Sequence, residues 1–410
     1  MRTQCPTGIF ALADDLSGAA ETAAALLPAA DSSDSARIDL DWRSGYDTAH
    51  SAHSVRVVDL NSRHLSSTEA ANRTSRVLAA EAGRYAAVFL KIDSLLRGNI
   101  AAIVDAARDR PTILAPTLPV AGRTVRTGVP LVHGVPLHQT DSWRAEASAP
   151  PATITGVLDE LPVTGVQLET IRSAGLTGVL AELTGSGRIA VCDGVTDTDL
   201  DLIARAAREL SEVRLIGSGG LAAALGRALR RSSRAGEHLA SPNHQLLIVV
   251  GTADPGAAKQ VRALVATGVQ PIACAATTLI TGESRTHDAD RIRAALLAGP
   301  TVLTIDAPGP IDPSTANALV RGLATTVATA VRSASQPVDL VLTGGETARQ
   351  VLDSLTIRSL TPITQVHHGA VHSRAPDGTS VITRPGSFGD ANSLVQIVAH
   401  LRPTPKQTEG

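Results

Sequence analysis

The chain has 410 residues, a length that predicts about two or three domains. Its composition, 43% hydrophobic and 19% charged, permits buried cores and argues against wholesale disorder. Its formal net charge of −2 at pH 7 argues against a polybasic surface that coats nucleic acid or an anionic membrane. Phe, Trp and Tyr together number seven, too few for a single-strand site built on base stacking.

Short apolar runs alternate with helical patterns in the first half of the chain. The predicted strands span 8–14, 55–60, 86–92, 111–117, 187–193 and 213–218. The predicted helices span 18–27, 68–82, 99–109, 198–210 and 221–230. This alternation is typical of βαβ units around a mainly parallel sheet. A Gly- and Pro-rich stretch at 122–137 interrupts it and predicts a hairpin that leaves the sheet.

A polar stretch at 231–243 separates this half from a second alternating region. There the predicted strands are 245–251, 300–306 and 338–344, and the predicted helices are 256–266, 288–298, 314–333 and 346–355. A hairpin-like stretch at 364–384 precedes a last helix at 391–401. We therefore predict an α/β fold of two domains, each with a mainly parallel sheet flanked by helices. The predicted domains are 1–232 and 244–402, with a linker at 233–243 and a frayed tail at 403–410.

Cysteine and histidine patterns predict neither a disulfide framework nor a metal site. Cys5, Cys192 and Cys274 are odd in number and far apart, which fits a reducing compartment. His367 and His368 are adjacent and would diverge on a strand. The N-terminus lacks the pattern of a signal peptide, and no window reaches about 18 uninterrupted apolar residues. We therefore expect a soluble cytoplasmic protein.

Two adjacent carboxylates, Asp14 and Asp15, follow the first predicted strand, and Ser17 and Gly18 then open a helix. The carboxyl ends of strands are where α/β sheets place function. One of these carboxylates could orient or deprotonate a substrate hydroxyl. Asp15 is equally well explained as the N-cap of the helix. Asp14 is harder to explain structurally, because two neighbouring carboxylates repel unless a cation or a hydroxyl binds them.

A second polar cluster, "KIDSLLRGN" at 91–99, ends another predicted strand. Lys91 and Arg97 supply positive charge beside a helix N-terminus, which suits a carboxylate or another anion. An ordinary surface ion pair with Asp93, worth little energy, is the alternative, but the density of polar groups favours function. Lys91 is one of three lysines against 34 arginines. This indicates a need for an ammonium group, although chance survival explains it equally well.

Glycine-rich turns lie at four predicted strand ends. The turn in 216–225 could cradle an anion through backbone N–H groups, but tight strand–helix packing explains it equally well. The turns in 249–256, 341–348 and 383–390 put small residues where backbone N–H groups can meet nucleotide phosphates. Glu346 could cap its own helix, or hold a ribose hydroxyl or a metal-bound water.

Taken in order, these motifs resemble the four-carbon acid sugar kinase family. The family's "ADDLTGA" is similar to "ADDLSGA" at 13–19, and its "K-x-DSTLRGN" is similar to the segment at 91–99. Its "APALPxxGRTxxxGxxxVxGxPLxxT", "GSGGLA", "TGGxTA" and "TKxGxFG" are similar, in that order, to 115–140, 217–222, 343–348 and 383–389. The resemblance runs from about residue 8 to residue 401.

The resemblance implies an N-terminal substrate domain, a C-terminal nucleotide-binding domain and an active site in the cleft between them. It implies phosphoryl transfer from ATP to a terminal hydroxyl of a four-carbon sugar acid such as a threonate, erythronate or 3-oxo-tetronate, with Mg²⁺ bridging the phosphates. The implied catalytic residues are Asp14, Asp15, Lys91 and Asp93. The implied substrate-binding residues are Ser17, Arg63, Ser94, Arg97, Gly98, Asn99 and Arg123. The implied nucleotide-binding residues are Ser218, Thr252, Gly344, Gly345, Glu346, Thr347, Gly386 and Gly389.

Within this set we expect Asp14 or Asp15 to accept the hydroxyl proton, and Lys91 or Arg97 to bind the substrate carboxylate. The expected partners are the sugar acid and ATP, with no nucleic acid and no membrane, and a homodimer is compatible with the sequence.

This chain departs from the family pattern at several places. Ser17 replaces a Thr, which keeps the hydroxyl, and Arg384 replaces a Lys, although the two are not equivalent at a phosphate. Thr252 stands where "GS" is common in the family, and 141–153 lacks the family's Asp-Pro pair. These departures leave the substrate's identity least secure.

Three alternatives stay open. One is a kinase for a different hydroxy acid in a specialised pathway. Another is a nicotinamide dehydrogenase, which would need a dinucleotide fingerprint that the sequence lacks. The third is a protein that binds sugar acid or nucleotide without turnover, against which the intact Asp14, Lys91, Asp93 and Arg97 argue.

Overall fold

The computed structural model describes most of the chain, in two parts. The described residues are 8–30, 35–43, 53–144, 146, 148–158, 160–230, 244–252, 254–307, 309 and 313–403. The predicted linker at 233–243, Cys5 and most of the predicted tail lie outside them. The chain divides into two compact units, Met1–Ala235 and Gly236–Gly410, and each is described by itself. The placement of the active site in a cleft between domains stays a prediction.

The N-terminal unit is built on a parallel sheet, as predicted. Its strands are β1 (Ile9–Ala13), β2 (Ala36–Asp39), β3 (Val55–Asp59), β4 (Ala87–Lys91), β5 (Thr112–Ala115), β9 (Val163–Val166), β10 (Ile189–Cys192) and β11 (Arg214–Gly217). They lie in the order β2-β3-β1-β4-β11-β5-β10-β9, with parallel pairings. Covered on both faces, the central strands are continuous apolar runs.

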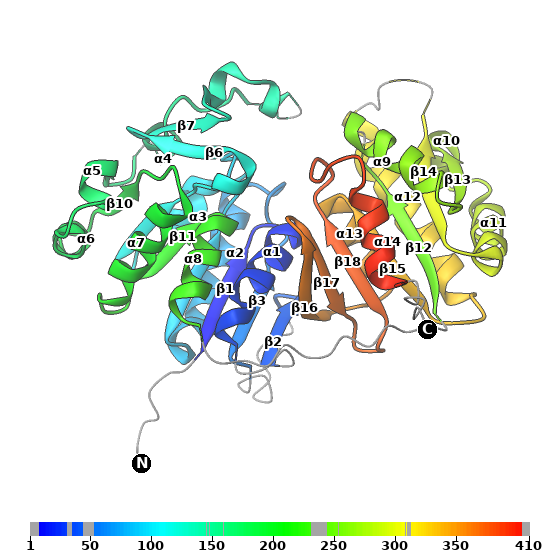
Figure 1. Ribbon diagram of the computed structural model, residues 1–410, viewed down its shortest axis with the longest axis horizontal. Coiled ribbons are helices and arrows are strands. Elements are labelled where there is room, and N and C mark those ends of the chain that lie inside the picture. The colour runs from blue at the N-terminus through cyan, green and yellow to red at the C-terminus, as the bar shows by residue number, and fades with distance from the viewer. Residues whose placement is uncertain are drawn as a thin grey trace, which may run out of the picture. The chain divides into compact units, whose positions relative to one another are not determined.

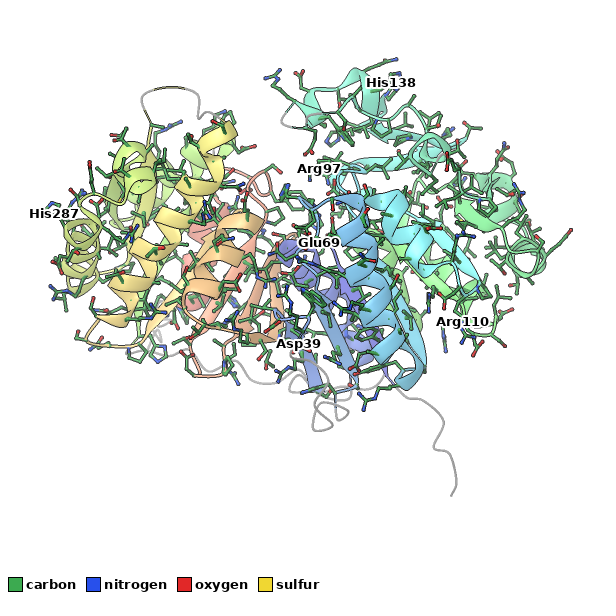
Figure 2. All side chains as sticks on the ribbon, turned by 180° about the vertical axis from the view of Figure 1, so that it is seen from behind. Asp39, Glu69, Arg97, Arg110, His138 and His287 are labelled. Atoms are coloured by element: carbon green, nitrogen blue, oxygen red, sulfur yellow. The ribbon has the colours of Figure 1, made fainter. Side chains whose placement is uncertain are left out.

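Helices cover both faces of this sheet (Figure 1, Figure 2). On one face lie α1 (Leu16–Leu26), α7 (Asp197–Arg208) and α8 (Gly219–Ala228), and on the other lie α2 (Ser67–Glu81) and α3 (Ile100–Ala107). Shorter helices are α4 (Ile154–Leu158), α5 (Leu168–Ile171) and α6 (Leu176–Gly185). Side-chain caps fix several helix starts: Asp15 caps α1, Ser66 caps α2, and Thr196 with Asp199 forms a capping box on α7.

The predicted hairpin is a small antiparallel sheet beside the carboxyl end of β4. It consists of β6 (Arg123–Arg126), β7 (Val129–Val132) and β8 (Val135–Pro136), and we call it the flap. The loop after β10 anchors it. Val125 and Gly194 exchange backbone hydrogen bonds of 2.8 and 3.0 Å. The buried Asp193 carboxylate accepts from the N–H groups of Thr127 (2.6 Å) and Gly128 (2.9 Å).

The C-terminal unit repeats the α/β pattern. Its strands are β12 (Gln245–Val250), β13 (Gln270–Ala275), β14 (Thr301–Asp306), β15 (Val338–Thr343), β16 (Ser359–His367), β17 (Ala370–Arg374) and β18 (Ser380–Arg384), in the order β13-β14-β12-β15-β18-β17-β16. The β17 strand is antiparallel to both of its neighbours, and the other pairings are parallel.

The helices of this unit also form two layers (Figure 1, Figure 2). On one face lie α9 (Pro255–Val265) and α14 (Ser393–Leu401). On the other lie α10 (Ala276–Thr281), α11 (Arg285–Ala298), α12 (Pro313–Arg332) and α13 (Gly345–Ser354). No helix in the described part of the chain is long and apolar enough to span a membrane.

The predicted strands and helices are present within a few residues of their expected bounds, but several elements escaped prediction. These are β2, β9, β13, α4, α5, α6 and α10. The β9 sequence is "VTGV" and that of β13 is "QPIACA"; both strands end their sheets and are partly exposed. A strand of this kind needs few apolar residues, so its sequence carries only a weak signal.

A buried ion network supports the N-terminal unit behind its apolar core. The Arg56 side chain donates to Asp39 (2.6 Å) and pairs with Glu81 (2.9 Å), and all three are buried. The guanidinium also lies over the ring of Phe10, 5.8 Å from its centroid. The network links β2, β3 and α2. The stability of the unit depends on all three charges being paired, because a buried charge without a partner is costly.

We expect Arg56→Leu to lower the free energy of unfolding of the N-terminal unit by about 3 kcal/mol, because two buried carboxylates lose their shared cation. Both tryptophans, Trp42 and Trp143, lie in this unit, so their fluorescence during urea unfolding reports on it. The control is Arg108→Leu, which breaks a half-exposed pair with Asp105 and should cost less than about 1 kcal/mol. Equal effects of the two changes would contradict a structural role for the buried network.

Candidate active site

The N-terminal site lies where the chain reverses direction across its sheet. From β1 the chain runs to β2 and β3 on one side, and then to β4 on the other side of β1. Such a switch point is where α/β sheets bind ligands, at the carboxyl ends of the strands. Asp14 and Asp15 follow β1, and Lys91 ends β4 in register with Ala13. The two motifs that the sequence separates by about 75 residues therefore meet at one sheet edge.

Figure 2 shows the same edge from the other side of the molecule. Arg97, which follows β4, lies at this carboxyl edge, and Arg110, which precedes β5, lies at the opposite edge. His138, just beyond the flap, lies farther out at the same end as Arg97. The flap therefore lies at the end of the unit that carries the polar motifs.

One guanidinium, that of Arg63, binds both adjacent carboxylates. Its Nε and Nη2 donate to the two Asp14 oxygens at 2.7 and 2.9 Å. Its Nη1 and Nη2 donate to the two Asp15 oxygens, both at 3.0 Å. Asp15 Oδ1 also accepts from the Gly18 N–H at 2.9 Å, so the capping interpretation of Asp15 is correct. The repulsion expected between neighbouring carboxylates is thus relieved by a shared cation.

The loop that carries Arg63 is held in place by Asn99 and Gly98. The Asn99 amide donates to the carbonyls of Ser62 (3.1 Å) and Leu65 (2.9 Å), and makes a longer contact of 3.4 Å with that of Arg63. Gly98 has φ +84°, and a Cβ there would lie 3.1 Å from Arg63 Cγ. Both residues, predicted to bind substrate, contact the arginine loop in this structure.

Lys91 pairs with a carboxylate that the sequence analysis did not select. Its Nζ lies 3.3 Å from Glu21 Oε2, and the lysine side chain is buried. Burial alone disfavours the ammonium ion, but the carboxylates of Glu21, Asp14 and Asp15 outweigh it and raise the pKa of Lys91. Glu21 lies on α1, one helical turn after Ser17, but it belongs to none of the motifs selected from the sequence, so only the fold reveals its contact with Lys91.

Asp93 and Arg97 form a second charged pair at the end of β4. Arg97 Nε and Nη2 donate to the two oxygens of Asp93 at 2.6 and 3.0 Å. Burial opposes ionisation of Asp93, but hydrogen bonds from Arg97 and the nearby cations hold its pKa well below the usual range. Burial raises the pKa of Asp14; the positive charge of Arg63 opposes this shift, and the negative charge of Asp15 reinforces it. The pKa values of Asp14 and Asp93 are therefore shifted in opposite directions.

The flap contributes Arg123 to the same edge. Arg123 Nη1 donates to Ser94 Oγ at 2.6 Å. Burial lowers the pKa of Arg123, so an anion placed beside it would be favoured. Trp143, which the sequence analysis did not select, donates from Nε1 to the Leu95 carbonyl at 2.7 Å. The flap and the segment after it therefore contact the turn that follows β4 at two points.

Ser17 and Ser218 differ in their contacts. Ser17 lies in the first turn of α1, and its buried hydroxyl has no hydrogen-bond partner among the described residues. Ser218 is fully buried; it donates to the Thr117 carbonyl (2.5 Å) and accepts from the Gly220 N–H (3.1 Å). Ser218 is thus the N-cap of α8 in the N-terminal unit, and its contact with a nucleotide stays a prediction.

The C-terminal unit gathers three glycine loops at one sheet edge. They follow β12, β15 and β18, which are adjacent and parallel. A Cβ at Gly251 would overlap the Thr347 side chain, and a Cβ at Gly386 would overlap that of Thr252. Gly344 has φ +98° at the start of α13. Small residues therefore let the loops approach closely, and the α13 N-terminus supplies backbone donors for an anion.

Of the remaining predicted residues in this unit, Glu346 is exposed in the first turn of α13, next to Gly345. Gly389 has φ +87°, and a Cβ there would overlap Ser393. The structure thus brings the predicted residues of this unit to the carboxyl ends of neighbouring strands.

Arg384 supports the last of these loops from inside the unit. It is fully buried, and its Nη1 donates to Gln260 Oε1 (2.7 Å) and Ser393 Oγ (2.8 Å), while Nη2 donates to the Phe388 carbonyl (2.5 Å). Burial lowers the pKa of Arg384 to about 10, with Asp254 opposing the shift. The arginine that replaces the family's lysine is therefore engaged with its own loop.

The described residues hold no cluster of three or more His, Cys, Asp or Glu side chains that could bind a metal ion. The carboxylates of Asp14 and Asp15 already accept hydrogen bonds from Arg63. The described donor set therefore fits a magnesium ion that is carried mainly by nucleotide phosphates, and not one held in a cage of side chains.

Comparison with known proteins agrees with the division of the chain into two units. A family model for a sugar-binding N-terminal domain matches residues 9–225, and one for a nucleotide-binding C-terminal domain matches residues 247–394. A D-threonate kinase from Cupriavidus necator is 32% identical over 403 residues, covering 93% of this chain and 95% of that protein. The chain belongs to the four-carbon acid sugar kinase family. The resemblance inferred from the motifs is confirmed.

A second kinase and a solved structure are also similar to this chain. A D-erythronate kinase from Heliobacterium modesticaldum is 29% identical over 227 residues, covering 49% of this chain and 48% of that protein. The crystal structure of a Salmonella typhimurium protein superposes with a TM-score of 0.79 at 21% identity, covering 95% of this chain and 98% of that one. The structural likeness supports the fold. Membership in this kinase family makes the chain a phosphotransferase that acts on an alcohol group.

We expect Arg63→Gln to raise the pKa of Asp14 by about 1 to 3 units, because this buried carboxylate loses its bound cation. Carboxyl ¹³C NMR titration of aspartate-labelled protein measures the change. Arg188→Gln is the control, because this exposed arginine hydrogen-bonds to Thr164 and the Val163 carbonyl. An unchanged titration of Asp14 in Arg63→Gln would contradict the binding of its carboxylate by Arg63.

Proposed function

We propose that this chain transfers the terminal phosphoryl group of ATP to the terminal hydroxyl of a four-carbon sugar acid of the threonate or erythronate type. The observation that carries the proposal is the clamp of Arg63 on Asp14 and Asp15 at the switch point between β1 and β4. A clamp of this kind keeps two carboxylates ordered beside a ligand site, where one of them can accept a proton from a hydroxyl.

Asp15 is the better candidate for the general base. Its side chain is 20% exposed, whereas that of Asp14 is 2% exposed. Although burial raises the pKa of Asp14, a base must first reach the proton that it removes. Asp14 receives two hydrogen bonds from Arg63 and fixes the orientation of that guanidinium. In this proposal Asp14 orders the site and Asp15 accepts the substrate proton.

Arg123 and Ser94 are the proposed partners of the substrate carboxylate. Arg97 is already bound through two nitrogens to a carboxylate, that of Asp93. Burial of Arg123 makes an added anion favourable, and a guanidinium offers a fork of donors that matches a carboxylate. This revises the expectation that Lys91 or Arg97 binds that group.

Lys91 is proposed to neutralise negative charge on the transferred phosphoryl group. Phosphoryl transfer depends on positioning and on neutralising negative charge, and it needs little covalent help from the protein. The loops after β12, β15 and β18, with the start of α13, are proposed to hold the nucleotide phosphates. When bound with the nucleotide, Mg²⁺ would neutralise the phosphates and orient them. Exposed Glu346 is the side chain proposed to reach a ribose hydroxyl or a metal-bound water.

The direct test measures ADP release from Mg-ATP with D- and L-threonate, D- and L-erythronate and 3-oxo-tetronates, with longer sugar acids as controls. Release that requires a four-carbon acid supports the proposal and names the substrate. Release only with a longer hydroxy acid would favour the altered segment at 141–153 as the determinant of a different substrate. Binding of nucleotide without release for any acid would favour a binding protein without turnover.

We expect Asp15→Asn to lower kcat by about 100-fold or more, with a smaller change in the KM for the acid, because the variant loses a positioned base and keeps a polar N-cap. Steady-state kinetics with the acid identified above measures both constants. Asp14→Asn is the matched variant and should mainly raise KM, because it loosens Arg63. Near-normal kcat in Asp15→Asn would remove Asp15 from the role of base.

We expect Gly386→Ala to raise the KM for ATP by about 10-fold, because its Cβ would overlap Thr252 and force the two loops apart. The KM for the acid should change little. Gly165→Ala in β9 is the control, since its Cβ meets no described atom within 4 Å. An unchanged KM for ATP in Gly386→Ala would place the nucleotide phosphates elsewhere.

A further inference from the structure

Glu21 lies against the active-site lysine from the neighbouring helix. It lies on α1, one turn after Ser17, and its Oε2 is 3.3 Å from Lys91 Nζ. The Glu21 side chain is 14% exposed and that of Lys91 is 6% exposed, so water screens this pair only weakly. The second oxygen, Oε1, is buried and accepts no hydrogen bond among the described residues. The carboxylate is therefore committed to Lys91.

Two glycines make room for this pair. A Cβ at Gly219, the first residue of α8, would overlap the Glu21 carboxyl group. A Cβ at Gly18 would lie 3.2 Å from Lys91 Nζ and 2.7 Å from Asp15 Oδ1. The glycine-rich turn after β11 therefore has a packing role that its resemblance to an anion cradle does not reveal. The positive end of the α8 dipole also favours a carboxylate at this place.

The charges around Lys91 come from four parts of the N-terminal unit. They are Glu21 on α1, Asp14 and Asp15 after β1, Arg63 in the loop after β3, and Asp93 on its own segment. The first turn of α8 carries no acidic residue. Asp14 and Asp15 are shared with Arg63, whereas Glu21 makes its ion pair with Lys91. Glu21 is therefore the carboxylate on which the position of the ammonium most depends.

We propose that Glu21 is a positioning residue for the reaction: seated against Gly219, it holds the Lys91 ammonium in its charged form beside the first turn of α1. Lys91 then keeps its positive charge and its place next to Asp15 without adopting a new conformation when substrate binds. The role of Lys91 in catalysis rests on the proposed function, but the pairing of Glu21 with Lys91 does not.

The test measures the pKa of Lys91 directly in the full-length chain. Amine labelling with acetic anhydride at a series of pH values, read by mass spectrometry, gives a midpoint for each lysine. The chain has three lysines, and exposed Lys259 is an internal reference. We expect Glu21→Gln to lower the Lys91 midpoint by about 1 to 3 pH units, the usual effect of losing an opposite charge at this distance. The Lys259 midpoint should not change.

Gly219→Ala provides a second and independent route to the same result. It leaves every charge in place but displaces the Glu21 carboxyl group, so the Lys91 midpoint should again fall. The matched control is Gly178→Ala in α6, where a Cβ meets no described atom within 4 Å. If Glu21→Gln or Gly219→Ala left the Lys91 midpoint unchanged in folded protein, the proposal would be wrong.

The pH dependence of kcat/KM distinguishes a positioning role of Glu21 from a purely structural one. In Glu21→Gln the alkaline limb of kcat/KM should move to lower pH together with the labelling midpoint, whereas loss of stability alone would not move it. A moved labelling midpoint with an unmoved kinetic limb would contradict the positioning role. If the native chain phosphorylates no acid, the labelling result still decides whether Glu21 sets the charge of Lys91, so the two proposals fail separately.

Discussion

The N-terminal site depends on one guanidinium that binds two adjacent carboxylates. Asp14 and Asp15 would repel each other at the end of β1 if Arg63 did not donate to all four of their oxygens. Arg63 in turn depends on the Asn99 amide, which holds the loop after β3 through its carbonyl groups. Residues of the "KIDSLLRGN" segment therefore build the site at two levels: Lys91 and Asp93 carry charge into it, and Asn99 fixes the loop that orders its carboxylates.

Much of the fold could be predicted from the sequence, because buried parallel strands are apolar runs and glycine or a polar cap marks the helix that follows. Strands such as β9 and β13, at the ends of their sheets, lack that signal. The motif residues could be predicted too, but not their partners. Glu21 looks like an ordinary helix residue in the sequence, and only the packing of α1 beside β4 and α8 brings it to Lys91. Ser218 and Arg384 show the opposite case: both lie in or beside family motifs, yet both are buried, with Ser218 bonded to the Thr117 carbonyl and Arg384 bonded to Ser393.

Glycine serves two physical purposes in this chain, and the sequence does not separate them. In the C-terminal unit, Gly251 and Gly386 let loops at one sheet edge approach each other closely, which suits backbone recognition of phosphates. In the N-terminal unit, Gly219 leaves space for a carboxylate that pairs with a buried lysine. A glycine-rich turn after a strand therefore indicates close approach of some group, and the contacts decide whether that group is a ligand or a side chain.

The most direct test of the account is the product formed from Mg-ATP and the four-carbon acid that supports ADP release. The account predicts one new phosphomonoester signal in the proton-coupled ³¹P NMR spectrum, split into a triplet by the two protons of the terminal carbon and formed in proportion to ADP. Inorganic phosphate as the only new signal, or an ester without that coupling, would contradict the proposed transfer to the terminal hydroxyl.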